Sequence, residues 1–250
     1  MKLSSDKRSA ISLVIISINI AAWVLLLTNP GHILTMAHCS DMGTSPPSLQ
    51  MLLIITPISL LLTGWALMVI AMMLPKLILP VWYIYGCSLK HHRFPSALLF
   101  VTGYIAVWMV AGLFLLSATL AVNLLIAQSY LPALIAGIVA LLWEFSPVKQ
   151  RCLNRGHKHP ALAAFGWPAS RDALLFGINH GLWCIGSGWA LMLLPMLLPK
   201  GHDLAMIIVT FIMLSEHLEH PQVPRWHLRW RSKLIRILFA QTQIGLKRAL

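Results

Sequence analysis

The sequence contains few charged residues. Only 10% of its 250 residues are Asp, Glu, Lys or Arg, whereas about a quarter are charged in a soluble domain. Acidic residues are the scarcest, with 7 Asp and Glu against 19 Lys and Arg. Because 58% of the residues are hydrophobic and the mean hydropathy is +0.77, this composition excludes a soluble globular domain and predicts a helical membrane protein.

The motifs of common enzymes are also missing. Serine, cysteine and histidine form no recognisable setting for a nucleophilic triad, and no glycine-rich phosphate loop is present. Nothing in the sequence therefore indicates an enzyme.

The net charge of +12 suggests nucleic-acid binding as one interpretation, but the basic residues separate apolar runs and form no groove-shaped patch. We expect them to set topology and to contact anionic lipid headgroups, and we expect no nucleic-acid partner.

Long apolar runs dominate the chain. Several exceed the roughly 18 residues that a bilayer-spanning helix needs, so the predicted fold is an all-α, polytopic transmembrane bundle of about six spans. Prolines 57, 75 and 80 should kink the second span, and the basic, Trp-containing tail 225–250 predicts an amphipathic helix on the membrane surface. A single transmembrane domain would occupy residues 1–224, with spans at about 10–28, 51–86, 96–126, 131–145, 172–198 and 203–218.

The distribution of basic residues predicts the topology. If both termini are cytoplasmic, every Lys and Arg except Lys76 and Lys200 lies on the inner side of the membrane, as the positive-inside rule requires. The segment from Pro147 to Arg171 is then a basic inner loop. We expect a multi-pass protein of the bacterial inner (cytoplasmic) membrane, with the lipid bilayer as its surroundings.

The predicted span 172–198 carries the strongest candidate for a site. His180 and Cys184 are one helical turn apart, which places them on one helix face at about 40° to each other. Imidazole and thiolate both bind copper and zinc. Glycines in the same span, such as Gly177 and Gly188, allow a neighbouring helix to come close. The pair predicts half of a soft-metal site, with copper as the expected metal and zinc as the alternative.

Other candidate ligands fall at similar depths when helical rise is applied along the other spans. They are Met68 and Met72 in the second span, Glu144 in the fourth, and Glu216 and His217 in the sixth. A charge at the centre of a membrane helix costs at least about 2.5–3.5 kcal/mol, so the carboxylates should meet histidine, Lys76 or a cation. Two alternatives remain open: the carboxylates lie at the inner water interface and pair with loop arginines, and the methionines only fill gaps in the core.

A second candidate site lies in the predicted outer loop. His32, His38, Cys39, Asp41 and Met42 offer donors for a soft metal arriving from outside. Their spacing matches no closed zinc motif, so a polar loop without a metal is the alternative. No two of the four cysteines are expected to face the oxidising side, and we therefore expect no internal structural disulfide.

Ordered sequence blocks resemble an uncharacterised bacterial family. Residues 65–75, WALMVIAMMLP, resemble the pattern W-x-x-M-x-x-A-M-M-x-P, and residues 177–192 resemble G-x-x-x-G-x-x-C-x-G-x-x-W-x-L-M. Residues 103–108 and 146–153 resemble two further blocks, and Glu216 falls where the family has a closing acidic residue. The family is that of predicted metal-binding integral membrane proteins (domain of unknown function 2182), so the resemblance implies a helical membrane fold and a bound metal.

The chain departs from this family at two positions. Members often carry a second cysteine where this chain has Gly156 and Gly188, and here His157 and His217 stand nearby. If paired cysteines bind the metal in the family, the resemblance implies that this site is either lost or rebuilt with histidine.

These observations predict a membrane protein that binds copper in its bundle and handles it or delivers it to a membrane metalloenzyme. His180 and Cys184 would be ligands, Met68 and Met72 thioether partners, and Glu144, Glu216 and His217 inner-side ligands or counter-ions. The alternative is a non-catalytic accessory subunit of a membrane complex, in which glycine and methionine only serve packing. A redox or oxygenase subunit would need a fuller ligand set than the sequence contains.

Overall fold

The computed structural model describes residues 5–28, 58–126 and 129–226, together with 236, 237 and 240. Within these residues the chain is helical and contains no strand, which confirms the predicted all-α class. The helices in chain order are α1 (Ser5–Thr28), α3 (Ile58–Met73), η2 (Leu74–Leu77), α4 (Ile78–Cys87), η3 (Lys90–His92), α5 (Arg93–Leu125), α6 (Leu131–Phe145), α7 (Pro147–Gly156), α8 (Gly166–Leu197) and α9 (His202–Leu218).

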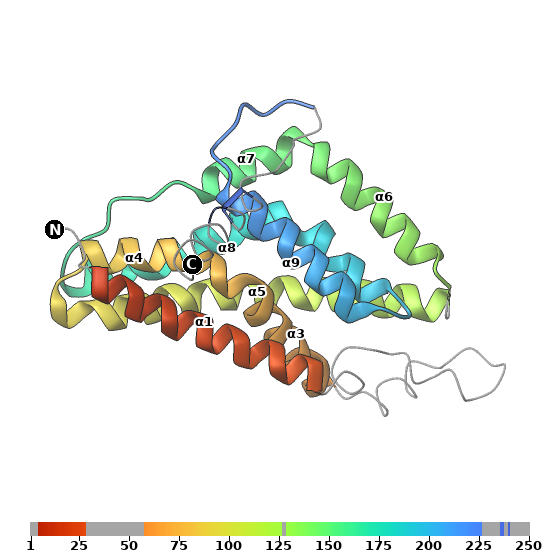
Figure 1. Cartoon of the computed structure of the whole chain (residues 1–250), viewed down its shortest axis with the longest axis horizontal. Helices are drawn as coiled ribbons and strands as arrows, with labels where there is room; N and C mark the ends of the chain where they lie inside the picture. Colours follow the sequence, from red (N-terminus) through yellow and green to blue (C-terminus); the bar gives the residue numbers. More distant parts are fainter. Residues whose placement is uncertain (1–4, 29–57, 127–128, 227–235, 238–239, 241–250) are drawn as a thin grey trace, which may run out of the picture.

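Helices α5 and α8 form the centre of the bundle (Figure 1). Their backbones touch where glycine removes a side chain. A Cβ atom on Gly177 of α8 would lie 2.1 Å from the backbone oxygen of Phe100 in α5, and one on Gly103 of α5 would lie 2.8 Å from the backbone oxygen of Leu174. The close approach expected from the glycines of the predicted span 172–198 is therefore present. Helices α1, α3 and α4 pack on one side of this pair, and α6, α7 and α9 on the other.

Four helical segments are long and apolar enough to cross a membrane: Asp6–Thr28, Ile58–Cys87, Lys90–Leu125 and Gly166–Leu197. The bent pair formed by α6 and α7, with 67° between its halves, adds a fifth if it is one broken span. This content indicates a membrane protein. Helix α9, with 17 residues, is not among the segments identified within the described part of the chain, so the number of six spans and the side of the termini stay predictions.

Two boundaries differ from the sequence prediction. The inner loop predicted between Pro147 and Arg171 begins with helix α7, because the Ser146 hydroxyl accepts the Val148 N–H at 3.1 Å and Pro147 occupies the first turn. Helix α8 also begins earlier than predicted, at Gly166. The predicted kink of the second span is present at Pro75 as the 3₁₀ segment η2.

Several predicted features lie outside the described residues. They are the start of the second span at 51–57, the outer-loop candidate site at 32–42, and most of the tail 225–250 with its proposed surface helix.

Trp65 joins α3 to α5 in the core. Its Nε1–H donates to the backbone oxygen of Trp108 at 2.9 Å, and its indole ring lies against Gly112, where a Cβ atom would be 2.1 Å from the ring nitrogen. Met68 and Met72 are also fully buried, at 0% and 1% exposure, in the same core. This half of the bundle is therefore fixed by aromatic and methionine packing.

The contact between α5 and α8 gives the first testable prediction. Gly177→Ala places a methyl group against the Phe100 backbone, which cannot move aside as a flexible side chain would. We expect a loss of about 1–3 kcal/mol in the free energy of unfolding, as for other overpacked cores, measured by thermal unfolding in mild detergent. Gly137→Ala is the matched control, because the nearest atom to its Cβ is Leu194 Cδ1 at an ordinary 3.8 Å. Equal stability of the two variants would contradict this account.

Candidate metal centre

His180 of α8 lies inside an aromatic enclosure. The residue is only 5% exposed. The centroid of its ring is 5.9 Å from that of Phe100, 5.8 Å from that of Tyr104 and 6.0 Å from that of Phe176. Two of these rings come from α5, and they reach His180 because the glycine contacts draw α5 against α8. Water is therefore excluded from most of the imidazole.

Cys184 faces the same neighbour as His180. The Tyr104 hydroxyl donates to the Cys184 sulfur at 3.2 Å, while the Tyr104 ring lies beside His180. Both side chains thus point toward Tyr104 of α5, which is the shared face that the one-turn spacing predicts. Cys184 is half-buried, and its thiol is free.

His217 of α9 approaches this pair from the other side. The His180 and His217 ring centroids are 6.4 Å apart, and the rings meet edge to face at 88°. The buried Nε2 of His217 has no hydrogen-bond partner. A neutral imidazole carries one N–H and one lone pair, and the lone pair can bind a metal ion. The unpartnered Nε2 of His217 is thus suited to a metal ion.

Elements far apart in the sequence meet near the two histidines. His180 belongs to α8 and His217 to α9, and His157, which follows α7 directly, stacks on His217.

His157, next to the family's second-cysteine position, does not complete a three-ligand site. Its ring stacks on His217 at 5.5 Å between centroids. One ring nitrogen lies 2.8 Å from the backbone oxygen of Leu153 and the other 3.0 Å from that of His217. Carbonyl oxygens only accept hydrogen bonds, so neither nitrogen directs a lone pair outward. In the part of the chain that is described, no group of three or more His, Cys, Asp or Glu is arranged to hold a metal.

The two predicted carboxylates meet a lysine. The Lys149 side chain, 0% exposed, forms ion pairs with Glu144 of α6 and with Glu216 of α9, the latter at 2.7 Å. The carboxylates thus pair with a basic residue of the predicted inner loop, although that residue is lysine and not arginine. Sequence reasoning missed Lys149 because it was placed in a loop. The capped first turn of α7, encoded by Ser146 and Pro147, is the signal that could have found it.

The two positions at which the resemblance implies a second cysteine, Gly156 and Gly188, have different surroundings. A Cβ atom on Gly188 would lie 2.2 Å from the Met213 Cε atom, so a thioether from α9 fills this space. A Cβ atom on Gly156 would meet no atom within 4 Å. Cys152, one turn before Gly156 in α7, lies against α8, with its sulfur 2.7 Å from the Cβ position of Gly186.

Met68 and Met72 lie in the apolar core cluster that also contains Phe100, Tyr104 and Phe176, the rings around His180. They belong to α3, which packs mainly against α1 and α5, and they are part of the core around Trp65. The structure brings the rings of His180 and His217 within 6.4 Å of each other and places both His180 and Cys184 beside Tyr104. Separately, it brings Glu144 and Glu216 to Lys149. It gives the two methionines the surroundings of packing residues.

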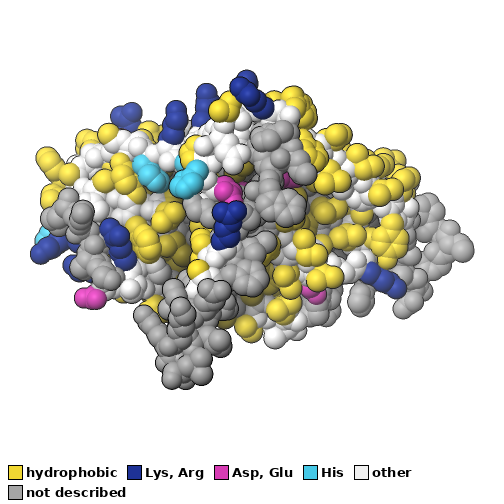
Figure 2. All heavy atoms as spheres, turned by 45° about the horizontal axis from the view of Figure 1, so that its top comes forward, with side chains coloured by type: hydrophobic (Ala, Val, Ile, Leu, Met, Phe, Trp, Pro, Cys, Tyr) yellow, Lys and Arg dark blue, Asp and Glu magenta, His cyan; other side chains and the backbone are white. Residues whose placement is uncertain are grey.

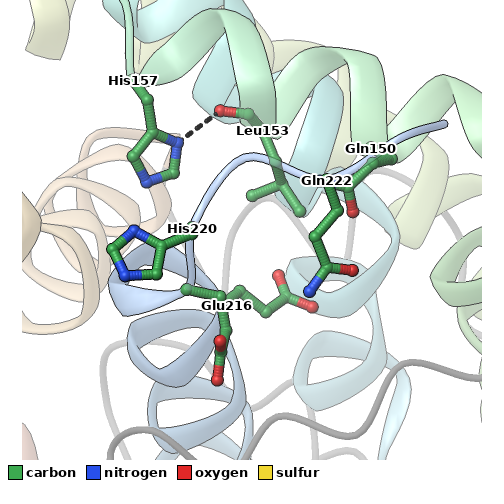
Figure 3. Close-up of a pocket in the computed structure, with 7 residues that line it drawn as sticks. Gln150, Leu153, His157, Glu216, His220 and Gln222 are labelled. Carbon is green, nitrogen blue, oxygen red and sulfur yellow. Dashed lines mark hydrogen bonds between the residues drawn. The ribbon is translucent and has the colours of Figure 1, made fainter.

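A polar pocket lies beside the ion pairs, between α7 and the end of α9 (Figure 3). Figure 3 shows His157, His220 and Glu216 around one space, with Gln150 and Gln222 on its far side. His157, which lines the pocket, also stacks on His217.

The segment that follows α7 packs against α4. His159 stacks on Tyr83 at 4.7 Å between centroids, and the Tyr83 hydroxyl donates to the Pro160 backbone oxygen at 2.6 Å. Partial burial of the ring, followed by the charge of His157, lowers the pKa of His159 below its usual range. His159 is therefore neutral at pH 7 and adds no positive charge near His180.

The buried ion pairs give the second prediction. Lys149→Met leaves two carboxylates without their cation, and breaking a buried pair in this way costs about 3–5 kcal/mol of stability. We expect a large fall in the thermal unfolding temperature in detergent. Lys158→Met, outside the bundle at the end of α7, is the control and should be neutral. The triple change Lys149→Met, Glu144→Gln, Glu216→Gln should recover much of the loss, and no recovery would argue against the ion pairs as the cause.

Comparison with known proteins places this geometry in a family. No curated protein and no solved structure gives a significant match to the chain. One protein family matches, described as "PpoB2: Copper chaperone", over residues 62–235. This range includes all of α4 to α9, with every residue of the candidate centre. The match confirms that the resemblance is to a copper-related family, while the narrower designation by domain number stays a prediction. Since well over half of the 250 residues are matched, the chain belongs to the PpoB2 copper chaperone family.

Proposed function

We propose that the chain carries copper as cargo, in its Cu(I) form, within the bacterial inner membrane and delivers it to a membrane metalloenzyme. The ligands are His180 and Cys184 of α8 and His217 of α9. The observation that carries this proposal is the buried, unpartnered Nε2 of His217, in a ring 6.4 Å from that of His180. Membership of a copper chaperone family supports copper as the cargo.

The donor set suits Cu(I) chemically. Thiolate and imidazole are both suitable ligands for copper, and Cu(I) is stable with only two or three ligands. The described residues hold no group of three or more His, Cys, Asp or Glu arranged around a metal, so in this proposal two of the three donors bind Cu(I) at a time. Binding releases the thiol proton, since a coordinating thiol is deprotonated.

The surroundings of the ligands favour holding copper without oxidising it. Phe100, Tyr104 and Phe176 exclude water from His180, and the Tyr104 hydroxyl fixes the position of the Cys184 sulfur. In this proposal Glu144 and Glu216 act through Lys149 and do not bind copper directly. The polar pocket beside them is the inner opening of the site.

Met68 and Met72 are not in the proposed ligand set, because α3 packs chiefly against α1 and α5. Zinc is the alternative metal, since it takes the same nitrogen and sulfur ligands. Zinc prefers four ligands, and the smaller set found here favours copper.

A non-catalytic accessory subunit is the second candidate function. It is favoured by the apolar outer face of α6, where Leu134, Ile138 and Leu141 are all more than half exposed. Such a face suits contact with lipid or with another membrane subunit. An accessory subunit would copurify with partners in stoichiometric amount and without metal.

The third prediction tests the copper ligands. Protein purified in mild detergent from copper-supplemented cells should contain near-stoichiometric copper by elemental analysis. His217→Ala and the double variant His180→Ala, Cys184→Ser should each lose most of it. His91→Ala, an exposed histidine of η3, should keep it.

The same measurement separates the two functions. Each variant is compared at equal helical content, so that a loss of copper is not a loss of fold. Met68→Leu with Met72→Leu should retain copper, because the proposed site does not include them. A well-folded parent protein without copper or zinc would overturn the copper proposal and favour the accessory subunit.

A further inference from the structure

An apolar groove lies on the outside of the bundle, away from the copper site. Its walls come from α1, from η2 with α4, and from the first turns of α5, and its twelve lining residues are all apolar or aromatic. Ile11 and Ile15 form one wall, Leu77 and Val81 the floor, and Ala97 and Val101 the other wall. The groove has a volume of about 400 Å³, and no residue of the candidate centre lines it.

The groove is somewhat shorter than the thickness of one lipid leaflet. It follows α5 from Phe94 to Val101, which is about 10 Å along a helix axis at 1.5 Å per residue. One leaflet of the hydrocarbon core is about 15 Å thick, half of the bilayer value. A transmembrane helix of a partner would need contact over about 30 Å, so the groove is too short for a partner helix and fits an acyl chain.

Exposed cations stand at one end of the groove. Lys7 and Arg8 come shortly before Ala10, the first residue of α1 that lines the groove. Lys90, in η3, comes four residues before Phe94, the first residue of α5 that lines it. The start of α1, the end of α4 and the start of α5 lie at the same end of the bundle (Figure 1). The Arg8 guanidinium lies 5.7 Å from the centroid of the Trp82 ring, which holds it beside α4.

Acidic residues do not cancel this charge. Asp6 is the acidic residue in the first turn of α1, and none occurs in α4, η3 or the first turn of α5. Arg93 is buried there, with its Nε donating to the Ser88 backbone oxygen at 3.2 Å. Figure 2 shows Lys and Arg side chains along the upper and left margins of the visible face and singly near its centre and right, among many apolar side chains. An apolar channel with a cationic mouth complements a molecule that has a hydrocarbon chain and an anionic head.

We propose that this groove binds one acyl chain of an anionic glycerophospholipid, with its phosphate held by Arg8, Lys7 and Lys90. Arginine pairs with phosphate through two parallel hydrogen bonds, and basic pockets between helices on the cytoplasmic side are suited to anionic headgroups. The inference rests on the membrane location in the proposed function and does not depend on copper binding. It makes the lipid a structural ligand that ties α1 to α4 and α5.

Native mass spectrometry in mild detergent tests the proposal. The parent protein is titrated with dioleoyl phosphatidylglycerol and, separately, with dioleoyl phosphatidylcholine, which shares the acyl chains but has no net charge. We expect at least tenfold tighter binding of phosphatidylglycerol, and loss of this preference in the double variant Arg8→Ala, Lys90→Ala. Lys200→Ala, which removes a cation from the short connection between α8 and α9, is the matched control and should keep the preference.

A second variant tests the groove itself. Leu98 lines the groove and is 55% exposed, so Leu98→Trp can fill it without disturbing the core, and it should weaken binding of both lipids. Equal affinity for the two lipids in the parent, or an unchanged preference in the double variant, overturns the proposal. A dimer that Leu98→Trp dissociates also overturns it, because the groove then holds a second copy.

Copper content is measured on the same samples. Leu98→Trp and the Arg8, Lys90 double variant should keep the copper of the parent protein, since the groove and the ligands share no residue. A lipid preference in a protein without copper would support the groove and refute only the copper site. Copper without a lipid preference would refute only the groove.

Discussion

The ion pairs of Lys149 are the interaction on which the rest of the candidate centre depends. A fully buried ammonium group between Glu144 and Glu216 joins α7 to the ends of α6 and α9. Removing Lys149 would take the cation away from two carboxylates in an apolar bundle, which is far costlier than exposing the same groups to water. The charge pairing therefore holds a short, polar helix inside a structure that is otherwise apolar.

The position of α7 then determines what surrounds the metal ligands. His157, the residue that follows its last residue, stacks on His217. Cys152 of the same helix lies against Gly186 of α8. On the opposite side, the glycine contacts with α5 bring Tyr104 to His180 and Cys184. The candidate centre therefore lies between two helices that pack against α8. Helix α7 is held there by the ion pairs of Lys149, and α5 comes close because glycines lack side chains.

Helical periodicity was enough to predict part of this arrangement. His180 and Cys184 share one face because they are four residues apart, and the glycines of α8 indicated a close neighbour. Local sequence could not reveal the partner of Glu144 and Glu216, because Lys149 reaches Glu216 only through a 67° bend between α6 and α7. It also could not reveal that Met213 fills the space beside Gly188, or that His157 stacks on His217. These contacts depend on tertiary packing between segments far apart in the sequence.

The exchange of cysteine for histidine has a physical consequence in the proposed site. One thiolate and one Cu(I) ion have no net charge together, and neutral imidazoles add none, so the loaded site contributes no charge to the apolar bundle. A second thiolate would leave the complex with a negative charge, which a membrane interior disfavours and which would need another cation besides Lys149. At Gly188 the thioether of Met213 fills the available space, and it too is uncharged. In the proposed function, this donor set would accept and release copper without changing the net charge of the bundle, with the Cys184 proton moving in the opposite direction. This coupling allows a buried site to exchange a cation without separating charge inside the membrane.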